Sequence, residues 1–450
     1  MPINVSILSL GCARNLVDSE VMLGILKGAG YKIVDGIDGA DVAIVNTCSF
    51  IEDAKKESID AILDVIELKE KKKIKHILVT GCLPQRYKGT LQTELKEVDG
   101  FIGVNGFGKL PQIIKALVKG ERIADIKSVP KYLYDDKTPR IRLTPKHYAY
   151  VKISEGCSHK CSFCVIPQLR GPHRSRKTDS VLKEASDLVK SGAKEINLIG
   201  QDTTLYGMDL YRRLALAELL KKLVKVKGVN WIRLLYAHPA NFTDEIIKIM
   251  KDEPAICKYV DLPIQHINDR ILKMMRRGAS KKAILNLLKK LRKEIPDLVI
   301  RTSIIVGFPG ETEAEFKELL EFIKDAQFER LGCFAYSREE GSPAYDFSSQ
   351  ISDAEKKSRW DEVMKVQQDV SRENNRKLMG RELDVIIDEK DDSDPNLYLG
   401  RSHMDAPEVD GIVYVKGSNI KVGEFVRVKI VDTYEYDLVG EATRKNESTK

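Results

Sequence analysis

Short apolar runs alternate with helix-length amphipathic stretches along most of this chain of 450 residues. In its first part, strand-like runs at 5–10, 42–45 and 77–79 are separated by helix-like stretches at 18–29 and 52–69. This alternation predicts parallel strands, because neighbouring parallel strands need a long crossover connection and a helix usually supplies it. We therefore predict an α/β protein that begins with a doubly wound parallel sheet over residues 1–120.

A second set of alternating runs follows a break in the pattern. Residues 127–146 contain three prolines and little apolar periodicity, which predicts a linker over 121–142. Helix-like stretches such as 180–190 and 281–293 then separate most of the next strand-like runs. These runs lie at 150–153, 195–199, 231–236, 259–262, 299–306 and 331–336. The pattern predicts a complete or partial parallel β/α barrel over 143–373, with its site at the carboxyl ends of the strands.

The last part of the chain, 376–441, has an all-strand pattern. Short apolar runs at 383–387, 398–400, 411–415 and 425–431 are separated by turn-rich segments, which predicts a small β-barrel.

Charge distinguishes this last part from the rest of the chain. Residues 381–440 carry 7 Lys and Arg against 14 Asp and Glu, a net charge of −7, whereas the whole chain has a net charge of +7. So acidic a domain repels phosphate and favours a basic protein partner. Asp405, Glu408 and Asp410 are its predicted contacts. Basic runs elsewhere, such as 69–75, are predicted to be solvated helix faces.

Composition and the start of the chain bear on its location. No run of eighteen apolar residues is present, and the apolar start lacks a positively charged leader. We therefore predict a cytoplasmic protein that has no membrane partner. In that compartment the eight cysteines are expected to be metal ligands or buried thiols rather than disulfides.

Three of these cysteines lie on one short loop, in the sequence GCSHKCSFC from Gly156 to Cys164. The thiolates of Cys157, Cys161 and Cys164 can hold three corners of a 4Fe–4S cluster and leave the fourth iron open for a substrate. The alternative is a structural zinc site with His159 or His173 as fourth ligand. Zinc knuckles usually pair two C-x-x-C halves, and no second pair follows, so the pattern favours a cluster.

Three other cysteines each follow a strand-like run of the first domain. Because the carboxyl ends of parallel strands meet at one edge of a sheet, Cys12, Cys48 and Cys82 are predicted to converge. Any one of them alone is better interpreted as a small buried hydrophobic residue. Three in the same topological position favour a shared site. Cys257 and Cys333 have no such partners and are predicted to be core residues.

The spacing C-x-x-x-C-x-x-C, with Phe163 before its last cysteine, resembles the signature of the radical S-adenosylmethionine (SAM) enzymes. The resemblance implies that the open iron binds SAM, and that an electron from the cluster cleaves SAM to a 5′-deoxyadenosyl radical. It also implies SAM contacts on the loop and at two strand ends. These are Phe163, Gln201 and Asp202 within 199–204, and Ser303 and Gly307 within 303–311. A tight turn is the alternative for 307–310.

A further resemblance, to the methylthiotransferases, covers roughly residues 3–440. It rests on the sequences around the first three cysteines, 11–20, 46–51 and 81–87. The resemblance implies a second, auxiliary 4Fe–4S cluster on Cys12, Cys48 and Cys82 that takes part in sulfur transfer. It also implies a TRAM-like barrel at 376–441.

Two branches of that family differ in substrate. The acidic barrel and the segments 201–204 and 400–411 resemble the branch that modifies the β carbon of an aspartate in small-subunit ribosomal protein number twelve. The implied partners are that protein or the small ribosomal subunit, and an electron donor such as flavodoxin or ferredoxin. The other branch, which modifies a tRNA adenosine, is the nearer alternative, although the acidic barrel makes tRNA a poor fit. A non-catalytic iron–sulfur or zinc scaffold is the more distant one.

Overall fold

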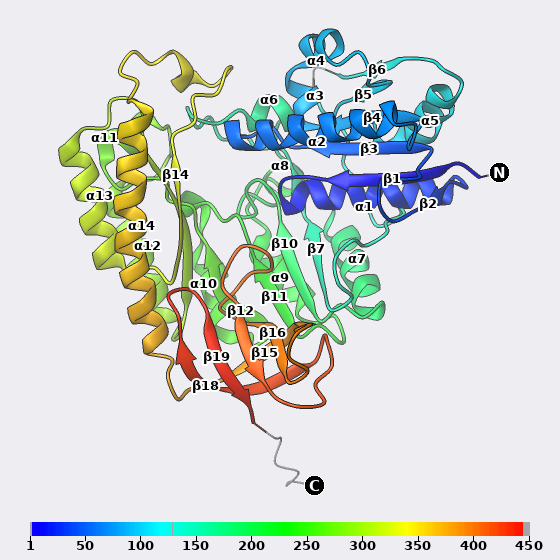
Figure 1. Cartoon of the computed structure of the whole chain (residues 1–450). Helices are drawn as coiled ribbons and strands as arrows, with labels where there is room; N and C mark the ends of the chain where they lie inside the picture. Colours follow the sequence, from blue (N-terminus) through cyan, green and yellow to red (C-terminus); the bar gives the residue numbers. More distant parts are fainter. Residues whose placement is uncertain (1, 128, 444–450) are drawn as a thin grey trace.

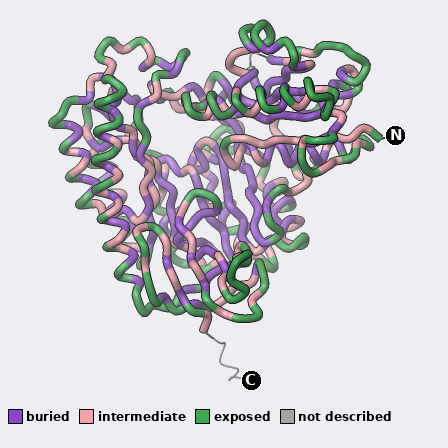
Figure 2. Tube along the Cα trace, in the orientation of Figure 1, coloured by how far each residue is buried: buried purple, intermediate pink, exposed green. Residues whose placement is uncertain are grey.

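Three units follow one another along the chain in the computed structural model, which describes residues 2–127 and 129–443 (Figure 1). The first unit lies at the top of the view, the second in the middle, and the third at the bottom. Strands and the elements between the units are largely buried, while the outer faces of the peripheral helices are exposed (Figure 2). No helix within the described ranges is both long and apolar enough to cross a bilayer.

The first unit is a six-stranded parallel sheet in the order β2-β1-β3-β4-β5-β6. Its strands are β1 (Asn4–Ser9), β2 (Lys32–Ile33), β3 (Val42–Thr47), β4 (His76–Gly81), β5 (Gly100–Ile102) and β6 (Ile123–Asp125). Its helices are α1 (Ala13–Gly28), α2 (Glu52–Glu70), α3 (Cys82–Arg86), α4 (Lys88–Glu94), η1 (Phe107–Lys109) and α5 (Leu110–Val118).

Both faces of this sheet are covered, as the doubly wound prediction requires. Alternate residues of β3 point to opposite sides: Val42 and Ile44 pack with α1 and α5, while Ala43 and Val45 pack with α2. The predicted linker 121–142 includes β6, which pairs with β5 and therefore belongs to the sheet. Three residues are too few to show strand periodicity, and so the sequence did not reveal this strand.

The second unit is another six-stranded parallel sheet, in the order β14-β13-β12-β11-β10-β7. These strands are β7 (Tyr148–Lys152), β10 (Glu195–Ile199), β11 (Trp231–Leu234), β12 (Ile256–Asp261), β13 (Val299–Val306) and β14 (Arg330–Ala335). All six predicted runs overlap these strands. Because β7 and β14 are its two edges, the sheet is a partial barrel.

Helices cover the outside of this partial barrel. Its main ones are α7 (Thr178–Lys190), α9 (Leu216–Leu223), α10 (Asp244–Asp252), α12 (Lys281–Glu294), α13 (Glu313–Ala326) and α14 (Asp353–Arg376). Shorter elements are the hairpin of β8 (Ser154–Glu155) and β9 (Arg174–Ser175), with α6 (Ile166–Arg170), α8 (Met208–Tyr211), α11 (Asp269–Met274), η2 (Pro239–Asn241) and η3 (Pro343–Asp346). Apolar side chains of the helices pack on the strands in one large core, which holds the carboxyl ends of the strands in place.

The third unit is a closed five-stranded barrel in the order β15-β16-β17-β19-β18. Its strands are β15 (Glu382–Lys390), β16 (Leu397–Ser402), β17 (Val413–Lys416), β18 (Phe425–Thr433) and β19 (Leu438–Ala442). The sequence predicted the first four of these. It missed β19, in which Gly440 and Glu441 interrupt the apolar run.

Candidate functional site

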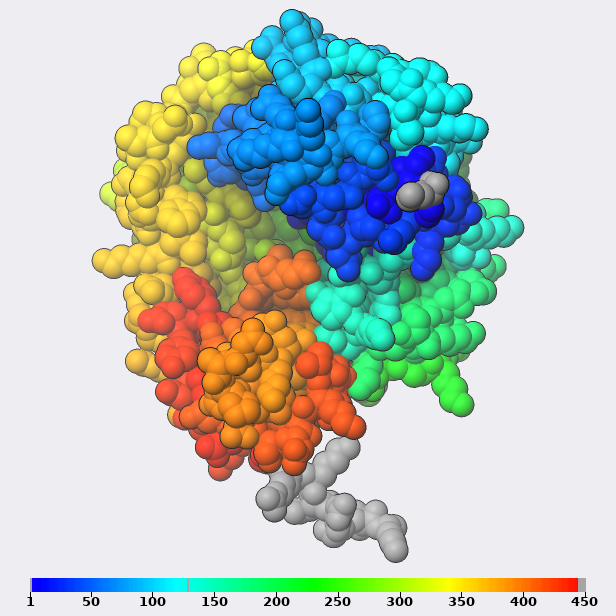
Figure 3. All heavy atoms as spheres, turned by 45° about the vertical axis from the view of Figure 1, so that its right-hand side comes forward, coloured from blue at the N-terminus to red at the C-terminus, as the bar shows by residue number. Residues whose placement is uncertain are grey.

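A cavity of about 540 Å³ is bounded by all three units. Its wall includes Cys12 and Arg14 from the first unit, Phe163 and Ser303 from the second, and Glu408 from the third. The space-filling view shows the surface hollowed between the blue first unit and the orange and red third unit (Figure 3). The size and the mixed apolar and polar wall are those of a small-molecule or cofactor site.

Backbone strain is present in the same wall. Tyr236 and Gln265, which both line the cavity, have φ angles of 58° and 77° in the left-handed region. Tyr236 is held there because its N–H donates to Asp261 Oδ2 at 2.9 Å and its carbonyl accepts from the N–H of Thr203 at 3.0 Å. Bulky residues adopt this conformation only where the surroundings impose it, and such positions gather at functional sites.

The first cysteine set lies at one edge of the first sheet, as predicted. Cys12 follows β1, Cys48 follows β3 and Cys82 follows β4, and the parallel register aligns the ends of these three neighbouring strands. Gly11, with φ at +83°, allows two of the loops to touch, because a Cβ on it would lie 2.7 Å from the Cβ of Cys48.

Electrostatics distinguish these three thiols. Burial alone would raise the pKa of Cys12, but the positive charges of Arg14 and Arg170 lower it to about 7. Burial, followed by the neighbouring Cys82 and Cys12, raises the pKa of Cys48 to about 12. The pKa of Cys82 is also raised, chiefly by burial. Cys12 is therefore the thiol of this set that loses its proton most readily.

The second cysteine set lies on the loop between β8 and α6. The N–H of Cys157 donates to the carbonyl of Gly171 at 3.0 Å, and that of Cys164 donates to the carbonyl of Cys161 at 3.2 Å, so local hydrogen bonds fix the loop. Burial raises the pKa of Cys157 to about 11 and that of Cys164 to about 12. Deprotonation of these thiols is thus expected to accompany metal binding.

Both cysteine sets fit an iron–sulfur cluster by their chemistry. Each offers three clustered thiols, the soft ligands that such clusters use. Each also has a guanidinium beside one sulfur: Arg170 Nη2 lies 3.5 Å from Cys82 Sγ, and Arg277 Nη1 lies 3.8 Å from Cys161 Sγ. Hydrogen bonds of this kind to ligand sulfurs tune a bound cluster.

The two histidines considered as zinc ligands have other partners in the structure. His159 Nε2 lies 2.6 Å from Asp202 Oδ2, and its ring stacks on that of His238 at 4.0 Å between centroids. His173 Nε2 lies 3.1 Å from Ser175 Oγ. Within the described ranges, no three His, Cys, Asp or Glu side chains are arranged around a single metal ion, as a mononuclear zinc site requires.

The structure places the predicted SAM residues in two environments. Phe163 and Ser303 line the cavity. Gln201 Nε2 donates to Glu155 Oε1 at 2.7 Å, Asp202 Oδ1 accepts from the N–H of Thr204 at 2.9 Å, and Gly307 has φ at +68° and lies against Lys356. Their contact with SAM therefore stays a prediction. Cys257 and Cys333 are buried, as expected of core residues.

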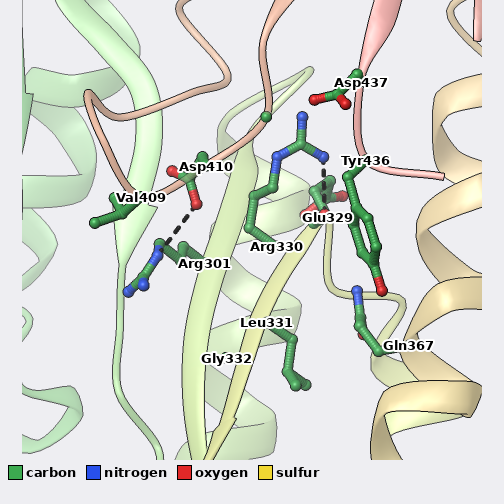
Figure 4. Close-up of a pocket in the computed structure, with 11 residues that line it drawn as sticks. Arg301, Glu329, Arg330, Leu331, Gly332, Gln367, Val409, Asp410, Tyr436 and Asp437 are labelled. Atoms are coloured by element: carbon green, nitrogen blue, oxygen red, sulfur yellow. Dashed lines mark hydrogen bonds and ion pairs between the residues drawn. The ribbon is translucent and has the colours of Figure 1, made fainter. Parts of the chain in front are cut away.

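The prediction that Asp405 and Asp410 face a partner is wrong. The side chain of Asp405 is 1% exposed and accepts from Arg330 Nε at 2.9 Å. Asp410 accepts from Tyr259 Oη at 2.6 Å. It also accepts from Arg301 Nε at 3.2 Å, as Figure 4 shows. Arginines of β13 and β14 draw these carboxylates inward, and sequence alone does not show such long-range partners.

Glu408, the third acidic residue of this set, is exposed and accepts from Tyr148 Oη at 3.0 Å. A smaller cavity of about 270 Å³ lies beside the first and shares Arg301 and Val409 with it. Figure 4 shows its wall, to which the third unit also contributes Tyr436 and Asp437.

Arg14 is a cavity residue that the sequence analysis missed. Its guanidinium lies over the ring of Tyr236, 4.3 Å from the centroid, and Nη1 donates to the carbonyl of Gly200 at 2.9 Å. It therefore joins the first unit to the carboxyl ends of two strands of the second. Its place two residues after Cys12 was the available signal.

Comparisons with known proteins agree with this division into three units. The sequence matches the Radical SAM superfamily over 151–323, the Uncharacterized protein family UPF0004 over 4–103 and the TRAM domain over 379–443. Among solved structures, the radical SAM methyltransferase TsrM from Kitasatospora setae is similar in fold, with a TM-score of 0.55 and 15% identity over 91% of this chain and 82% of that one.

Relatives of nearly equal length are much closer in sequence. The ribosomal protein uS12 methylthiotransferase RimO of Citrifermentans bemidjiense is 49% identical over 97% of this chain and 98% of its own. The proteins of that name from Geobacter sulfurreducens and Thermoanaerobacter sp. are 49% and 48% identical, each over 97% of this chain and over 98% and 99% of their own.

The fold and the loop of three cysteines thus define a radical SAM enzyme. Within that class, the chain belongs to the RimO family of methylthiotransferases. The cofactors of the family are SAM and two 4Fe–4S clusters, which confirms the cofactors that the sequence predicted.

Proposed function

We propose that this protein adds a methylthio group to the β carbon of an aspartate in ribosomal protein uS12, in the cytoplasm. Cys157, Cys161 and Cys164 hold one 4Fe–4S cluster, and Cys12, Cys48 and Cys82 hold the other. The observation that carries the proposal is the shared cavity, in whose wall Cys12 and Phe163 both lie. A substrate radical formed near the loop of Cys157, Cys161 and Cys164 can therefore react with sulfur delivered at Cys12, Cys48 and Cys82 in the same cavity.

The chain itself supplies position and protection for this reaction. When bound, the loop cluster and SAM supply the radical that removes hydrogen from the target carbon, and the auxiliary cluster supplies the sulfur. Aromatic side chains Phe163, Tyr150 and Tyr236 line the cavity, and their rings give part of its wall an apolar surface. Arg14 ties the Cys12 loop to the carboxyl end of β10 in the second unit, because it donates to the carbonyl of Gly200 and lies beside Cys12.

The mouth of the cavity suits a protein loop. Phe50, Phe334 and Val409 come from the three different units, line the cavity, and are 40%, 45% and 56% exposed. Exposed apolar groups around a cleft mark a protein contact. Elsewhere on the third unit, the end of β15 and the turn after it carry the exposed acidic residues Glu389, Asp392 and Asp394, which favour a basic ribosomal protein over tRNA.

The assignment is tested by mass spectrometry of uS12 incubated with the reconstituted enzyme, SAM and a flavodoxin or ferredoxin reducing system, the proposed electron donor. We expect a mass increase of one methylthio group, located on an aspartate by fragmentation. A parallel reaction with tRNA covers the alternative branch. Unmodified uS12 together with methylthiolated adenosine in tRNA would show that tRNA, and not uS12, is the substrate.

The number of clusters gives the first testable prediction. Because each 4Fe–4S cluster holds four irons and four sulfides, the anaerobically reconstituted chain is expected to contain about eight of each. Iron and acid-labile sulfide analysis measures both. Saturation at half these values would contradict the presence of a cluster on each cysteine set. Zinc in place of iron would instead favour a non-catalytic zinc scaffold.

Exposed acidic residues of the barrel give the second prediction. Replacing Glu389, Asp392 and Asp394 with Gln, Asn and Asn is expected to weaken uS12 binding roughly three- to tenfold at low salt, because three weak charge contacts are lost. The difference should shrink at high salt, where screening acts over a Debye length of about 3 Å at 1 M.

The matched control neutralises three exposed acids on α2, Glu57, Asp60 and Asp64, with the same change in net charge. Binding titrations at both salt concentrations measure the effect. Equal weakening by both triple variants would show that total charge, and not the barrel surface, attracts the partner.

A further inference from the structure

A group of buried polar side chains lies where the first unit meets the second. Arg170 of α6 donates to Asp18 Oδ2 of α1 at 2.7 Å, and Lys152 of β7 donates to Glu155 Oε2 at 2.6 Å. Asn15, also on α1, completes the group, and all five residues are buried. Two cations face two carboxylates, so the group is balanced in charge and can persist away from water.

Asn15 ties together two of the cysteine loops of the first unit. Its Nδ2 donates to the carbonyl of Leu10 at 2.7 Å and lies 3.3 Å from the carbonyls of Asn46 and Thr47. Leu10 stands two residues before Cys12, and Thr47 stands directly before Cys48. One side-chain amide therefore fixes the backbone that leads into both thiols.

Arg170 adds the third cysteine loop to this arrangement. Its Nη2 donates to Asn15 Oδ1 at 3.1 Å and lies 3.5 Å from Cys82 Sγ. A guanidinium presents several donors in a fixed fork, and so one side chain can hold the amide, the carboxylate and the sulfur together. Yet Arg170 belongs to the second unit, six residues after Cys164 of the other cysteine set.

We propose that Arg170 is a positioning residue of the auxiliary site, which the first unit cannot complete alone. The proposal rests on the proposed function, since it takes Cys12, Cys48 and Cys82 as cluster ligands. Arg170 donates to the Cys82 thiolate and, through Asn15, orients the loops of Cys12 and Cys48. A positive donor beside a ligand sulfur stabilises the reduced cluster, and so Arg170 raises its reduction potential.

The test uses the full chain with Cys157, Cys161 and Cys164 replaced by alanine, so that only the auxiliary cluster is observed. Arg170→Met and the charge-balanced pair Arg170→Met with Asp18→Asn are compared with this parent. We expect redox titration followed by electron paramagnetic resonance to give a lower potential in both, or iron analysis to show loss of the cluster from a folded chain. The charge-balanced pair decides the result if Arg170→Met alone does not fold.

Arg140→Met is the matched control. Arg140 is another buried arginine of the same interface and bridges two carboxylates, Glu20 of α1 and Glu184 of α7, without reaching a cysteine. It is expected to leave the potential of the cluster unchanged. An unchanged potential in both Arg170 variants, or an equal shift in Arg140→Met, would overturn the proposal. Absence of any cluster from the parent would instead count against the ligand assignment in the proposed function.

Discussion

Replacing Cys157, Cys161 and Cys164 with alanine is expected to abolish reductive cleavage of SAM while iron and sulfide remain at the other cysteine set. The two sets lie on separate backbone elements, one after β8 and the other at the edge of the first sheet. Replacing the thiols of one set is therefore expected to leave the backbone that carries the other set unchanged. Chromatography of 5′-deoxyadenosine, with iron analysis of the same sample, measures both effects.

The reverse substitution separates the two roles. With alanine at Cys12, Cys48 and Cys82, we expect 5′-deoxyadenosine to form but no methylthiolated uS12. Alanine at the buried Cys257 and Cys333 is the control, because neither belongs to a cysteine set, and product should still form. Normal amounts of methylthiolated uS12 from the variant that lacks the first set would exclude those cysteines from sulfur delivery.

The substitution Asp405→Ala is expected to cause a large decrease in melting temperature. The substitution would leave the Arg330 guanidinium buried at the interface without its carboxylate partner, since Arg330 Nε and Nη2 both donate to Asp405 Oδ1. Breaking a buried ion pair in this way costs about 3–5 kcal/mol. In a unit of roughly 200 residues, such as the second unit that contains Arg330, this lowers the melting temperature by roughly 6–20 °C. Differential scanning calorimetry measures the shift.

Asp432→Ala is the control for this prediction, because Asp432 is an exposed acid of the same barrel, and its melting temperature should match that of the wild type. If Asp405→Ala also had the melting temperature of the wild type, the ion pair between Asp405 and Arg330 would not anchor the barrel. A point substitution tests the interface more cleanly than removal of the barrel. Removal would also uncover Arg233 and Glu195, which the barrel residue Arg401 and the Ser402 and His403 carbonyls now contact.

The sequence predicted the long elements because their patterns are local. Five of the six strands of the second unit, all except β14, bury four or more residues, and these apolar runs are visible without any partner. The strands β2, β5 and β6 contain two or three residues each, and neighbouring strands, rather than their own sequence, determine them. The cysteines were predictable for a similar reason, since parallel register brings equivalent strand ends together.

The contacts between units could not be predicted in this way. Arg170 and Asp18 are 152 residues apart, and Arg301 and Asp410 are 109 apart. A single arginine in a sequence does not indicate which distant carboxylate it meets, nor whether an acidic residue will face solvent or an arginine. For this reason the net charge of the barrel indicated the kind of partner, whereas the choice of Asp405 and Asp410 as contact residues was wrong.

Because all three units form the wall of the cavity, the cavity is completed late in synthesis of the chain. Cys12 leaves the ribosome early in synthesis, but the cavity that it borders is closed only when Pro407, Glu408 and Val409 have been made. The first unit also lacks Arg170 until the chain has grown past α6. A nascent chain therefore exposes the thiols of the first cysteine set long before the cavity is complete. The enzyme can become active only after residues 407–409 have been made.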